Sequence, residues 1–519
     1  MTGRTPYFVT TPIYYVNDAP HLGHAYTTIA CDVMARFKRL DGYDVRFLTG
    51  TDEHGQKVQK SAEAAGIDPQ TFTDRVSQNF RDLTGLLNIS NDDFIRTTEP
   101  RQHRAVQALW QRLVESGHVT LGSYNGWYSV RDEAYYGEEE LTTRDGQRFA
   151  PTGAPVEWVE EPSYFFKLSA FQEPLLKLYE DRPDFILPAG KRSEVVSFVK
   201  SGLRDLSISR TTFSWGIKVP GDEAHVMYVW LDALTNYITA LGFPETGEGT
   251  PYARYWPADL HMVGKDILRF HTIYWPAFLM AVGLPLPRRV FAHGWWTVEG
   301  EKMSKSLGNV VKPADLLDTY GLDQTRYFLM REIPFGNDGD FSRKVMIQRI
   351  NGELANDYGN LCQRVLSMIQ KYCGGVLPQP DTLAEGDKAM LAAGQGLLAA
   401  VRTELDMQAF HKALDAIWAV IGQANRYVDE MAPWSLKKTD PVRLGTVLHT
   451  LAETIRRVAI LTQPFMPDAS NRILDQLVIA GDARDFRALQ DRPVTPGTLL
   501  PAPQGVFPRY VETEAGGAA

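Results

Sequence analysis

The first fifty residues contain the pattern that most limits the fold: a strand, an amphipathic helix and a second strand in close succession. Residues 7–15 are rich in β-branched and aromatic side chains, which favour a buried strand. After a turn at 16–20, apolar residues recur at the spacing of one helix face, at Leu22, Tyr26, Ile29, Val33, Phe37 and Leu40. Residues 45–48 then predict another strand. A β-α-β unit implies a parallel sheet with a right-handed crossover, so we expect an α/β fold.

Two histidines stand at the start of that helix, at the carboxyl end of the first strand, where an open α/β sheet binds its ligand. His21 and His24 are three residues apart and therefore share a helix face. A helix N-terminus offers unpaired N–H groups and a positive dipole end, so the pair suits a phosphate group. Gly23 between them allows a flat base to approach the backbone. Zinc fits less well, because the metalloprotease helix has histidines four apart and a general-base Glu. On its own, the motif also fits two ordinary, partly buried histidines.

The composition is that of an ordinary globular chain. Its 519 residues, 44% apolar and 23% charged, predict two to four domains. Three cysteines are too few for a disulfide scaffold, and the N-terminus does not resemble a signal peptide, so we expect a cytoplasmic protein. The longest uncharged run, 270–287, contains three prolines and favours a buried segment over a membrane helix. A formal net charge of −9 argues against indiscriminate binding to DNA but allows a local nucleic-acid face.

A second pattern suited to phosphates lies at 299–309, with the sequence EGEKMSKSLGN. Lys302 and Lys305 flank small residues between Gly300 and Gly308. Lysine is a compact charge with three donors, so such a loop can close over phosphate groups. Taken alone, a loop of this kind is most often a solvated surface turn.

With both motifs in this order, the sequence resembles the class I aminoacyl-tRNA synthetases, whose signatures are HIGH and KMSKS. Here they read HLGH at 21–24 and KMSKS at 302–306. Other segments are similar to the methionyl-tRNA synthetases, and the resemblance runs to about residue 510: FLTGTDEHG (47–55), DLSISR (205–210), YVWLDALTNY (228–237), VGKDILRFHTIYWP (263–276) and APWSLKK (432–438).

The resemblance implies a methionine–tRNA ligase. Such an enzyme activates methionine with ATP to methionyl-adenylate and pyrophosphate. It then transfers methionine to the 3′-terminal adenosine of the initiator and elongator methionine tRNAs. The expected partners are ATP, methionine and tRNAs with the anticodon CAU, without DNA or membrane.

The same resemblance implies a set of ATP contacts. His21 and His24 would hold the phosphates while the methionine carboxylate attacks the α-phosphorus. Lys302 and Lys305 would close over the β- and γ-phosphates, on which Mg²⁺ is expected. This is catalysis by positioning and charge stabilisation, without a protein nucleophile. The implied ATP-binding residues are His21, Gly23, His24, Gly264, Lys265, Asp266, Lys302, Ser304 and Lys305.

The implied methionine pocket is largely aromatic. A thioether accepts only weak hydrogen bonds, so it must be recognised by shape and by aromatic contact. Asp52 would bind the substrate ammonium, and Arg210 would lie near the carboxylate. Leu234 departs from many relatives, which have proline four residues after the pocket tryptophan. The implied residues are Ile13, Tyr15, Asp52, Arg210, Trp230, Leu234, Tyr237 and His271. Each aromatic residue alone would indicate core packing.

The expected architecture is a Rossmann-like parallel-sheet catalytic domain, interrupted by an α+β connective insertion and followed by an α-helical anticodon-binding bundle. Many relatives hold zinc in this insertion, but here it has no cysteine and only His118 before His225. Tetrahedral zinc needs four such ligands, so we predict no structural zinc. The expected segments are 1–115 (catalytic, first half), 116–225 (insertion), 226–292 (catalytic, second half), 293–348 (stem contact, with KMSKS), 349–475 (bundle) and 476–519 (C-terminal extension).

The resemblance also implies an anticodon site in the helical half. Its residues are Asn360 and Arg364, in the segment NLCQR, and Trp434, which follows a proline. Asn and Arg can hydrogen-bond splayed base edges, and Trp can stack on a base. Trp434 alone would also fit a residue that caps the bundle. No appended C-terminal module is recognisable, so we expect a monomer.

Three other functions deserve comparison. A class I synthetase for isoleucine, valine, leucine or cysteine is disfavoured by the short insertion without cysteine. A nucleotidyltransferase with HxGH and a lysine loop, acting without tRNA, is disfavoured by the anticodon motif and the helical half. A catalytically inactive tRNA-binding paralogue is disfavoured by the intact HLGH and KMSKS.

Overall fold

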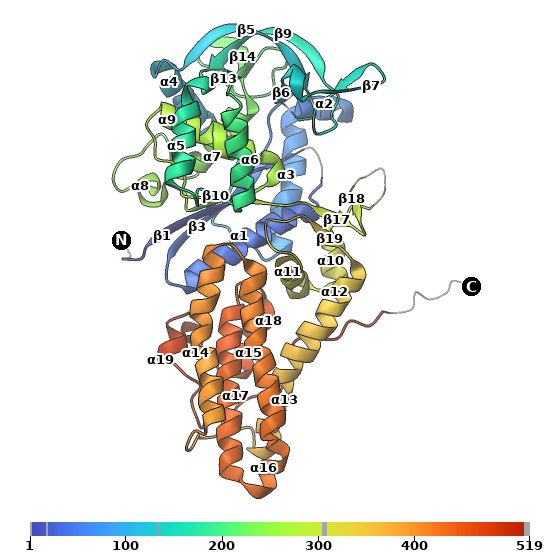
Figure 1. Cartoon of the computed structure of the whole chain (residues 1–519), viewed down its shortest axis with the longest axis vertical. Helices are drawn as coiled ribbons and strands as arrows, with labels where there is room; N and C mark the ends of the chain where they lie inside the picture. Colours follow the sequence, from blue (N-terminus) through green and yellow to red (C-terminus); the bar gives the residue numbers. More distant parts are fainter. Residues whose placement is uncertain (1–2, 17–18, 133, 304–308, 513–519) are drawn as a thin grey trace, which may run out of the picture. The chain divides into compact units, whose positions relative to one another are not determined.

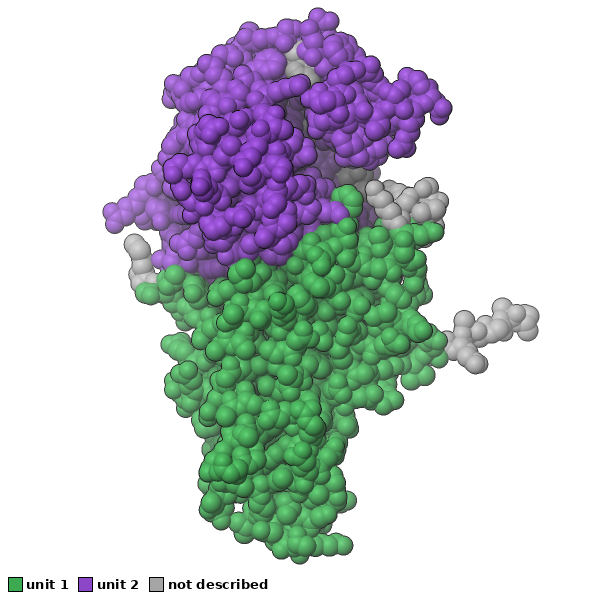
Figure 2. Space-filling model, in the orientation of Figure 1, with its two compact units in different colours: residues 1–5, 32–44, 294–519 green, residues 6–31, 45–293 purple. Residues whose placement is uncertain are grey.

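The computed structural model describes residues 3–16, 19–132, 134–303 and 309–512 (Figure 1). The chain divides into two compact units, which Figure 2 shows in different colours. The sheet unit comprises Pro6–Cys31 and Val45–His293. The helical unit comprises Met1–Thr5, Asp32–Asp44 and Gly294–Ala519.

A seven-stranded sheet forms the centre of the sheet unit, in the order β10-β16-β15-β1-β3-β2, with β4 paired to β3. The pairs whose register is described are all parallel. Helix α1 (Leu22–Leu40) connects β1 to β3, so the predicted β-α-β unit and the α/β fold are confirmed. The strands are β1 (Pro6–Thr10), β2 (Tyr14–Tyr15), β3 (Asp44–Asp52), β4 (Asp93–Arg96), β10 (Ile186–Leu187), β15 (Leu260–Gly264) and β16 (Val290–His293).

The strand predicted over residues 7–15 is wrong in one respect, because two strands replace it. β1 ends at Thr10, and β2 begins at Tyr14. Pro12 lies between them and has no N–H to donate to a sheet. The Thr11 hydroxyl instead donates to the Pro12 carbonyl at 2.7 Å. After this break β2 pairs with the end of β3 and places Tyr15 opposite Asp52.

The predicted insertion combines antiparallel strands with the helices α5 (Gln172–Asp181) and α6 (Ala189–Lys200). The long hairpin of β5 (Val119–Ser129) and β9 (Glu157–Phe166) continues into a four-stranded sheet, in the order β11-β9-β5-β6. One short strand of this region, β10, joins the edge of the central sheet beside β16. The predicted domain boundaries stay predictions. The remaining strands here are β6 (Ala134–Tyr136), β7 (Thr142–Arg144), β8 (Gln147–Phe149), β11 (Leu206–Ser207), β12 (Ser209–Arg210), β13 (Lys218–Val219) and β14 (Asp222–Met227).

Helices surround the sheets of this unit and form its apolar core with them. Phe8 of β1, Leu48 of β3 and Val263 of β15 are fully buried in one cluster with side chains of the helices. The helices are α2 (Gln56–Ala65), α3 (Pro69–Leu86), α4 (Pro100–Glu115), α5 (Gln172–Asp181), α6 (Ala189–Lys200), α7 (Val229–Thr239), α8 (Pro251–Tyr255) and α9 (Trp275–Ala281). A π-helical turn, Phe270–Tyr274, leads into α9.

The helical unit begins with a small sheet and continues as the predicted helical bundle. Strands β17 (Trp296–Val298), β18 (Glu301–Lys302) and β19 (Gly339–Phe341) form the sheet. In the bundle, α14, α15 and α17 lie side by side (Figure 1). The helices of this unit are α10 (Pro313–Tyr320), α11 (Leu322–Arg331), α12 (Arg343–Arg349), α13 (Asn360–Tyr372), α14 (Glu385–Asp406), α15 (Phe410–Met431), α16 (Pro433–Thr439), α17 (Pro441–Thr462), α18 (Pro467–Gln476) and α19 (Ala488–Asp491).

Two further properties of the helices match their sequences. The segment Ile350–Gly359 joins α12 to α13 as a π-helical stretch, so the amphipathic pattern over 343–372 is nearly continuous. None of the helices in the described part of the chain combines the length and apolar character needed to span a bilayer.

Candidate active site

The two histidines of HLGH lie at the N-terminus of α1, beside one another. Their ring centroids are 3.9 Å apart, with an interplanar angle of 32°. The backbone N–H of Gly23 donates to His21 Nδ1 at 3.1 Å, and the backbone N–H of His21 donates to His24 Nδ1 at 3.1 Å. Each Nδ1 atom is therefore occupied by a backbone donor.

These contacts determine which nitrogen of each ring carries the proton. A backbone N–H can only donate, so both Nδ1 atoms act as acceptors, and a neutral ring then carries its proton on Nε2. Burial, and then the charge of His21, holds the pKa of His24 well below its usual value. His24 is therefore a neutral imidazole with an Nε2–H donor. Placed at a helix N-terminus, such donors suit an anionic oxygen.

Aromatic rings hold the His24 side chain in place. The ring of Tyr14 lies 4.9 Å away and that of Phe80 5.1 Å away, both edge to face. The Tyr14 hydroxyl hydrogen-bonds to Thr28 Oγ1 at 2.7 Å, which ties β2 to α1. These contacts leave His24 little freedom to turn away from the position that its Nδ1 bond favours.

Two glycines make room for neighbouring polar side chains. A Cβ atom on Gly23 would lie 3.0 Å from the His21 ring, so glycine allows this ring to fold over the first helical turn. A Cβ atom on Gly264 would lie 2.5 Å from Asp266 Oδ1. Lys265 and Asp266 form a short 3₁₀ turn directly after β15. GKD therefore lies at the carboxyl end of a central strand.

His293 was not singled out by the sequence, yet it lies between these two motifs. It ends β16, and its Cα pairs with that of Gly264 in the neighbouring strand. The Thr27 hydroxyl donates to the Gly23 carbonyl at 3.1 Å, and His293 Nε2 lies 2.7 Å from the same hydroxyl oxygen. His293 therefore links the first helical turn to the strand beside GKD. The available signal was its place at the end of an apolar run.

Trp230, Tyr237 and His271, three of the residues predicted for methionine, form a cluster between α7 and the turn before α9. The Tyr237 hydroxyl lies 2.6 Å from His271 Nε2, and His271 Nδ1 lies 2.9 Å from the Ile267 carbonyl. Trp230 stacks on Phe270, with ring centroids 3.8 Å apart, and meets His271 edge to face. Phe270 was missed by the sequence analysis, although it is the aromatic neighbour of His271. Leu234 is buried on α7, the helix that carries Trp230 and Tyr237.

The hydrogen bonds of His271 determine its tautomer as well. A carbonyl only accepts, so Nδ1 carries the proton and Nε2 accepts from the Tyr237 hydroxyl. Burial lowers the pKa of His271 to about 4. The folded protein therefore holds a neutral imidazole above that pH. An uncharged wall suits a thioether, which pairs poorly with a charge.

We expect Tyr237→Phe to make methionine binding sensitive to pH in a range where the wild type is not. Without the hydroxyl, His271 Nε2 becomes a buried acceptor without a partner, so protonation is opposed less strongly. Methionine affinity of the wild type should stay level from about pH 8 to pH 5, since the pKa of His271 is about 4. The variant should bind methionine about three- to tenfold more weakly, which is the cost of one neutral hydrogen bond. As the pH falls, its affinity should begin to decline at a higher pH than that of the wild type. Methionine titrations at several pH values measure both effects. Parallel pH profiles would contradict this account.

Tyr15 and Asp52 lie opposite each other on β2 and β3. Asp52 is 6% exposed. The Tyr15 hydroxyl donates to the carbonyl oxygen of His54 at 3.1 Å, and the Lys57 ammonium lies 5.5 Å from the Tyr15 ring. Ile13, just before β2, packs against the main apolar core. The predicted ammonium and aromatic ligands are thus brought to one strand end.

Arg210 lies inside the insertion, among aromatic rings. Its side chain is 2% exposed, and the guanidinium carbon lies 4.4–5.5 Å from the rings of Tyr128, Tyr135 and Tyr228. Nη1 donates to the Ser209 carbonyl at 2.6 Å. These contacts describe a cation held by π faces. No described contact joins Arg210 to the Trp230–His271 cluster.

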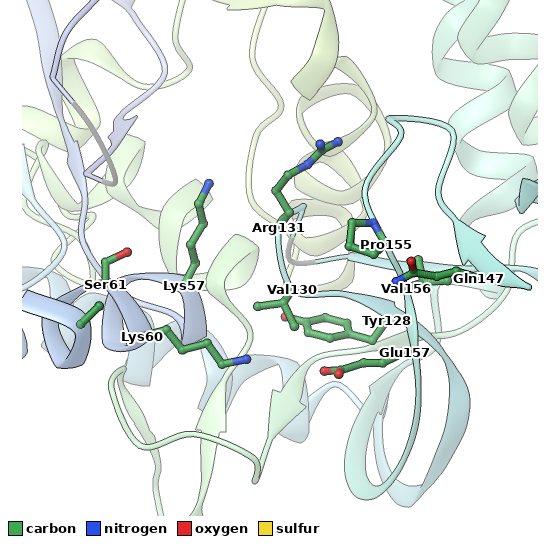
Figure 3. A pocket seen from close by; sticks show the side chains of 11 residues that line it. Lys57, Lys60, Ser61, Tyr128, Val130, Arg131, Gln147, Pro155, Val156 and Glu157 are labelled. Carbon is green, nitrogen blue, oxygen red and sulfur yellow. The ribbon is translucent and has the colours of Figure 1, made fainter. Parts of the chain in front are cut away.

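A cavity of about 640 Å³ lies between α2 and the insertion (Figure 3). Lys57 and Lys60 line it from α2, and Arg131 and Glu157 line it from the insertion. Lys60 extends from α2 toward the side that carries Val130 and Tyr128 (Figure 3). One of its lining residues, Lys57, also lies 5.5 Å from the ring of Tyr15, the sheet neighbour of Asp52.

The KMSKS motif is only partly described. Glu301–Lys302 form β18, which pairs with β17 of the helical unit. Ser304 and Lys305 lie outside the described residues. Their predicted roles stay predictions.

The predicted anticodon residues lie on two neighbouring helices of the bundle. Asn360 and Arg364 share one face of α13, and the Arg364 guanidinium lies 5.9 Å from the ring of Trp434 on α16. Arg364 also pairs with Asp429 of α15 at 2.8 Å. Trp434 is 45% exposed. Residues seventy positions apart thus form a surface with an indole face beside a guanidinium.

The histidines of the insertion are engaged in other contacts. His118 Nδ1 lies 2.9 Å from Ser116 Oγ, and His225 Nδ1 lies 2.9 Å from Ser209 Oγ. Within the described ranges, no group of three or more His, Cys, Asp or Glu side chains is arranged to hold a metal ion. The expectation of a zinc-free insertion stays a prediction.

Comparisons with known proteins cover almost the whole chain. The family described as "tRNA synthetases class I (M)" matches residues 7–366, and the "Anticodon binding domain of methionyl tRNA ligase" matches residues 377–515. The chain is 59% identical to the methionine–tRNA ligase of Brucella suis biovar 1, over 98% of this chain and 99% of that protein. It is 57% identical to that of Rhizobium meliloti, over 99% and 100%.

Solved structures agree with these relatives. Mycobacterium tuberculosis methionyl-tRNA synthetase in complex with methionyl-adenylate superposes with a TM-score of 0.95 at 53% identity. The match covers 97% of this chain and 100% of that one. The apo form of the same enzyme superposes with a TM-score of 0.89 at 50% identity, over 98% and 99%.

Proposed function

The chain belongs to the methionyl-tRNA synthetases of class I, which are ATP-dependent ligases, and we propose how its own residues perform the two reactions. In the first, methionine and ATP form methionyl-adenylate and pyrophosphate. In the second, the 3′-terminal adenosine of a methionine tRNA takes the methionyl group and AMP leaves. Mg²⁺ enters with ATP, as part of that substrate.

The observation that carries the activation step is the pair of imidazoles at the start of α1. With both Nδ1 atoms occupied by backbone N–H groups, the Nε2–H groups of His21 and His24 are the donors for phosphate oxygens. As the methionine carboxylate oxygen attacks the α-phosphorus, the bond to the pyrophosphate oxygen breaks and negative charge grows on the leaving group. Fixed donors stabilise that charge without reorganisation.

The remaining ATP contacts follow the sequence motifs. We propose that Gly23 borders the adenosine, that Gly264, Lys265 and Asp266 contact ATP at the end of β15, and that the loop with Lys302, Ser304 and Lys305 neutralises the departing pyrophosphate. The lysines supply charge as mobile ammonium groups. No protein nucleophile is needed, because the substrate carboxylate is the attacking group.

Methionine is proposed to lie between α7 and the ends of β2 and β3, which carry Tyr15 and Asp52. Asp52 would pair with its ammonium group. Tyr15, Trp230, Tyr237 and His271 would surround the side chain, supported by Ile13, Leu234 and Phe270. Support comes from the neutral His271 and the stacked Trp230–Phe270 pair, which offer an uncharged, polarizable wall. Arg210 is proposed to act near the methionine carboxylate. In the structure its guanidinium lies among the rings of three tyrosines.

A methionine-dependent ATP–pyrophosphate exchange assay, followed by aminoacylation of a tRNA with the anticodon CAU, tests this function. Exchange should require methionine and MgATP. Isoleucine, valine, leucine and cysteine should support far less exchange at equal concentration. Exchange with one of these in place of methionine, or no exchange at all, would overturn the proposal.

The tRNA-binding roles divide between two surfaces. Asn360, Arg364 and Trp434 are proposed to read the anticodon. The cationic cavity beside α2 is proposed to hold phosphates of the acceptor end, because Lys57, which lines it, lies 5.5 Å from the ring of Tyr15, the sheet neighbour of Asp52. A monomeric state and a cytoplasmic location also remain predictions from the sequence.

Lys60→Ala is expected to weaken aminoacylation and leave exchange unchanged. Lys60 is exposed and lines the cavity, so it would meet a phosphate and not methionine. Losing one contact should lower kcat/KM for tRNA about three- to tenfold and reduce the salt slope by about 0.7–0.9. Lys177→Ala, on the exposed face of α5, is the matched control. An unchanged salt slope would show that the cavity is not a phosphate site.

A further inference from the structure

A buried histidine–aspartate pair joins the two sides of the proposed methionine pocket. His54 follows Asp52 by two residues at the end of β3. Asp232 lies in the first turn of α7, two residues after Trp230. His54 Nδ1 is 2.6 Å from Asp232 Oδ2, and the two side chains are 4% and 1% exposed. Neither residue belongs to the sequence-predicted site.

Both carboxylate oxygens of Asp232 have a hydrogen-bond partner. Its Oδ1 accepts a hydrogen bond from Gln102 Nε2 at 2.9 Å, and the same amide donates to the Asp232 carbonyl at 2.6 Å. A carboxylate only accepts, so His54 Nδ1 is the donor in the pair. The His54 ring meets the rings of His103 and Trp215 edge to face, at 5.5 Å and 5.4 Å. The imidazole therefore has one defined orientation.

The backbone beside His54 carries groups of the pocket. Its carbonyl oxygen accepts from the Tyr15 hydroxyl at 3.1 Å. The preceding carbonyl, that of Glu53, accepts from the Trp215 indole N–H at 2.6 Å. The Glu53 carboxylate is buried and pairs with Arg96 at 2.7 Å. A shift of His54 would therefore move Tyr15 and the adjoining Asp52.

We propose that His54 and Asp232 are positioning residues for methionine, which fix the separation between the Asp52–Tyr15 side and the Trp230 side of the pocket. They act through these three residues, without contacting the substrate. This role rests on the proposed methionine site. A buried charge-assisted hydrogen bond is short and directional, so it suits the task of holding two separate elements in register. Misplacing a binding group by about 1 Å can lower a reaction rate about 10²-fold. Because other contacts also hold these residues, we expect a smaller effect here.

The test is a KM and kcat comparison in methionine-dependent exchange, with active sites titrated. His54→Ala should raise the KM for methionine about tenfold and leave the KM for ATP and kcat per active site nearly unchanged, since only ground-state positioning of methionine is lost. His54→Asn places an amide N–H near the position of Nδ1 and should restore most of the affinity. His54→Gln places its amide near Nε2 and should not.

The matched control is His118→Ala. His118 also has its Nδ1 bonded to a side chain, Ser116 Oγ at 2.9 Å, and lies against Phe166 and Phe171 in the same unit. This control should leave the KM for methionine unchanged.

The outcomes separate the two proposals. If His54→Asn and His54→Gln show the same KM, or if His54→Ala lowers only the active fraction, the pair is structural and the inference is wrong. Asp232→Asn should reproduce the effect of His54→Ala, and the double variant should be little worse than either single one, because both remove the same interaction. Additive effects would contradict the pair. If the wild type fails to activate methionine, the proposed function itself is wrong.

Discussion

Replacing His24 by leucine should lower the rate of methionyl-adenylate formation about 10²–10³-fold, the cost of one preorganised donor to a developing charge. The neutral His24 ring donates from Nε2, and leucine removes that donor while filling the apolar space between Tyr14 and Phe80. The lost interaction belongs to the transition state, so methionine affinity should change little. Single-turnover formation of the adenylate and equilibrium binding of methionine give the two quantities.

Two amide variants make the His24 prediction specific to one nitrogen. His24→Gln places an amide N–H near the position of Nε2 and should recover part of the rate. His24→Asn keeps an acceptor near Nδ1 for the backbone N–H of His21 but lacks the distal donor, so it should be as slow as leucine. If asparagine is faster than glutamine, the capping contact at Nδ1 matters more than the phosphate donor. Equal loss of methionine affinity in all three variants would contradict the assignment.

Trp434→Ala should cut aminoacylation at limiting tRNA about ten- to a hundredfold, while methionine-dependent exchange stays almost intact. Stacking of one base on an aromatic ring contributes about 1–3 kcal/mol, which sets this range. The indole is 45% exposed and lies beside the Arg364 guanidinium, so a splayed base meets a π face and a donor together. Comparing kcat/KM for tRNA with the exchange rate measures the separation.

The controls for Trp434 distinguish base stacking from bundle stability. Trp434→Phe keeps a π face and should recover most of the activity. Leu86→Ala removes an apolar side chain of similar exposure from the end of α3 and should leave tRNA binding unchanged. Discrimination against a tRNA with a changed first anticodon base should shrink in Trp434→Ala. If exchange and aminoacylation fall together, Trp434 stabilises the bundle and does not read the anticodon.

Local sequence patterns were sufficient to predict much of the fold and the family of this protein. Residues 7–48 predicted a β-α-β unit because helix and strand periods are properties of neighbouring residues, and α1 confirms it over Leu22–Leu40. The break at Pro12 was missed because β-branched and aromatic residues stand on both sides of it, while the missing N–H affects only hydrogen bonding. HLGH, KMSKS and the methionine-pocket motifs identified the family because their residue types and order are specific.

Motif resemblance grouped some distant residues into one site, but the contacts that they make had no signal in the sequence. The position of Arg210 among three tyrosines, the Trp230–Phe270 stack and the neighbouring Arg364 and Trp434 all depend on which elements fold against each other. The His54–Asp232 pair joins residues 178 positions apart. Motif spacing cannot indicate such a pair, because each partner alone is an ordinary polar residue near a strand end or a helix start.

The sequence by itself determined the fold class, the family and the residue types available for ATP, methionine and tRNA, since these follow from local periodicity and motif order. Only the tertiary structure decided the chemical state of those residues. His24 donates from Nε2 because a backbone N–H occupies its Nδ1, whereas His271 accepts at Nε2 because a carbonyl occupies its Nδ1. The same side chain thus carries an Nε2–H donor in one place and a buried Nε2 acceptor in the other. Burial and hydrogen-bond partners, which the fold alone supplies, make that difference.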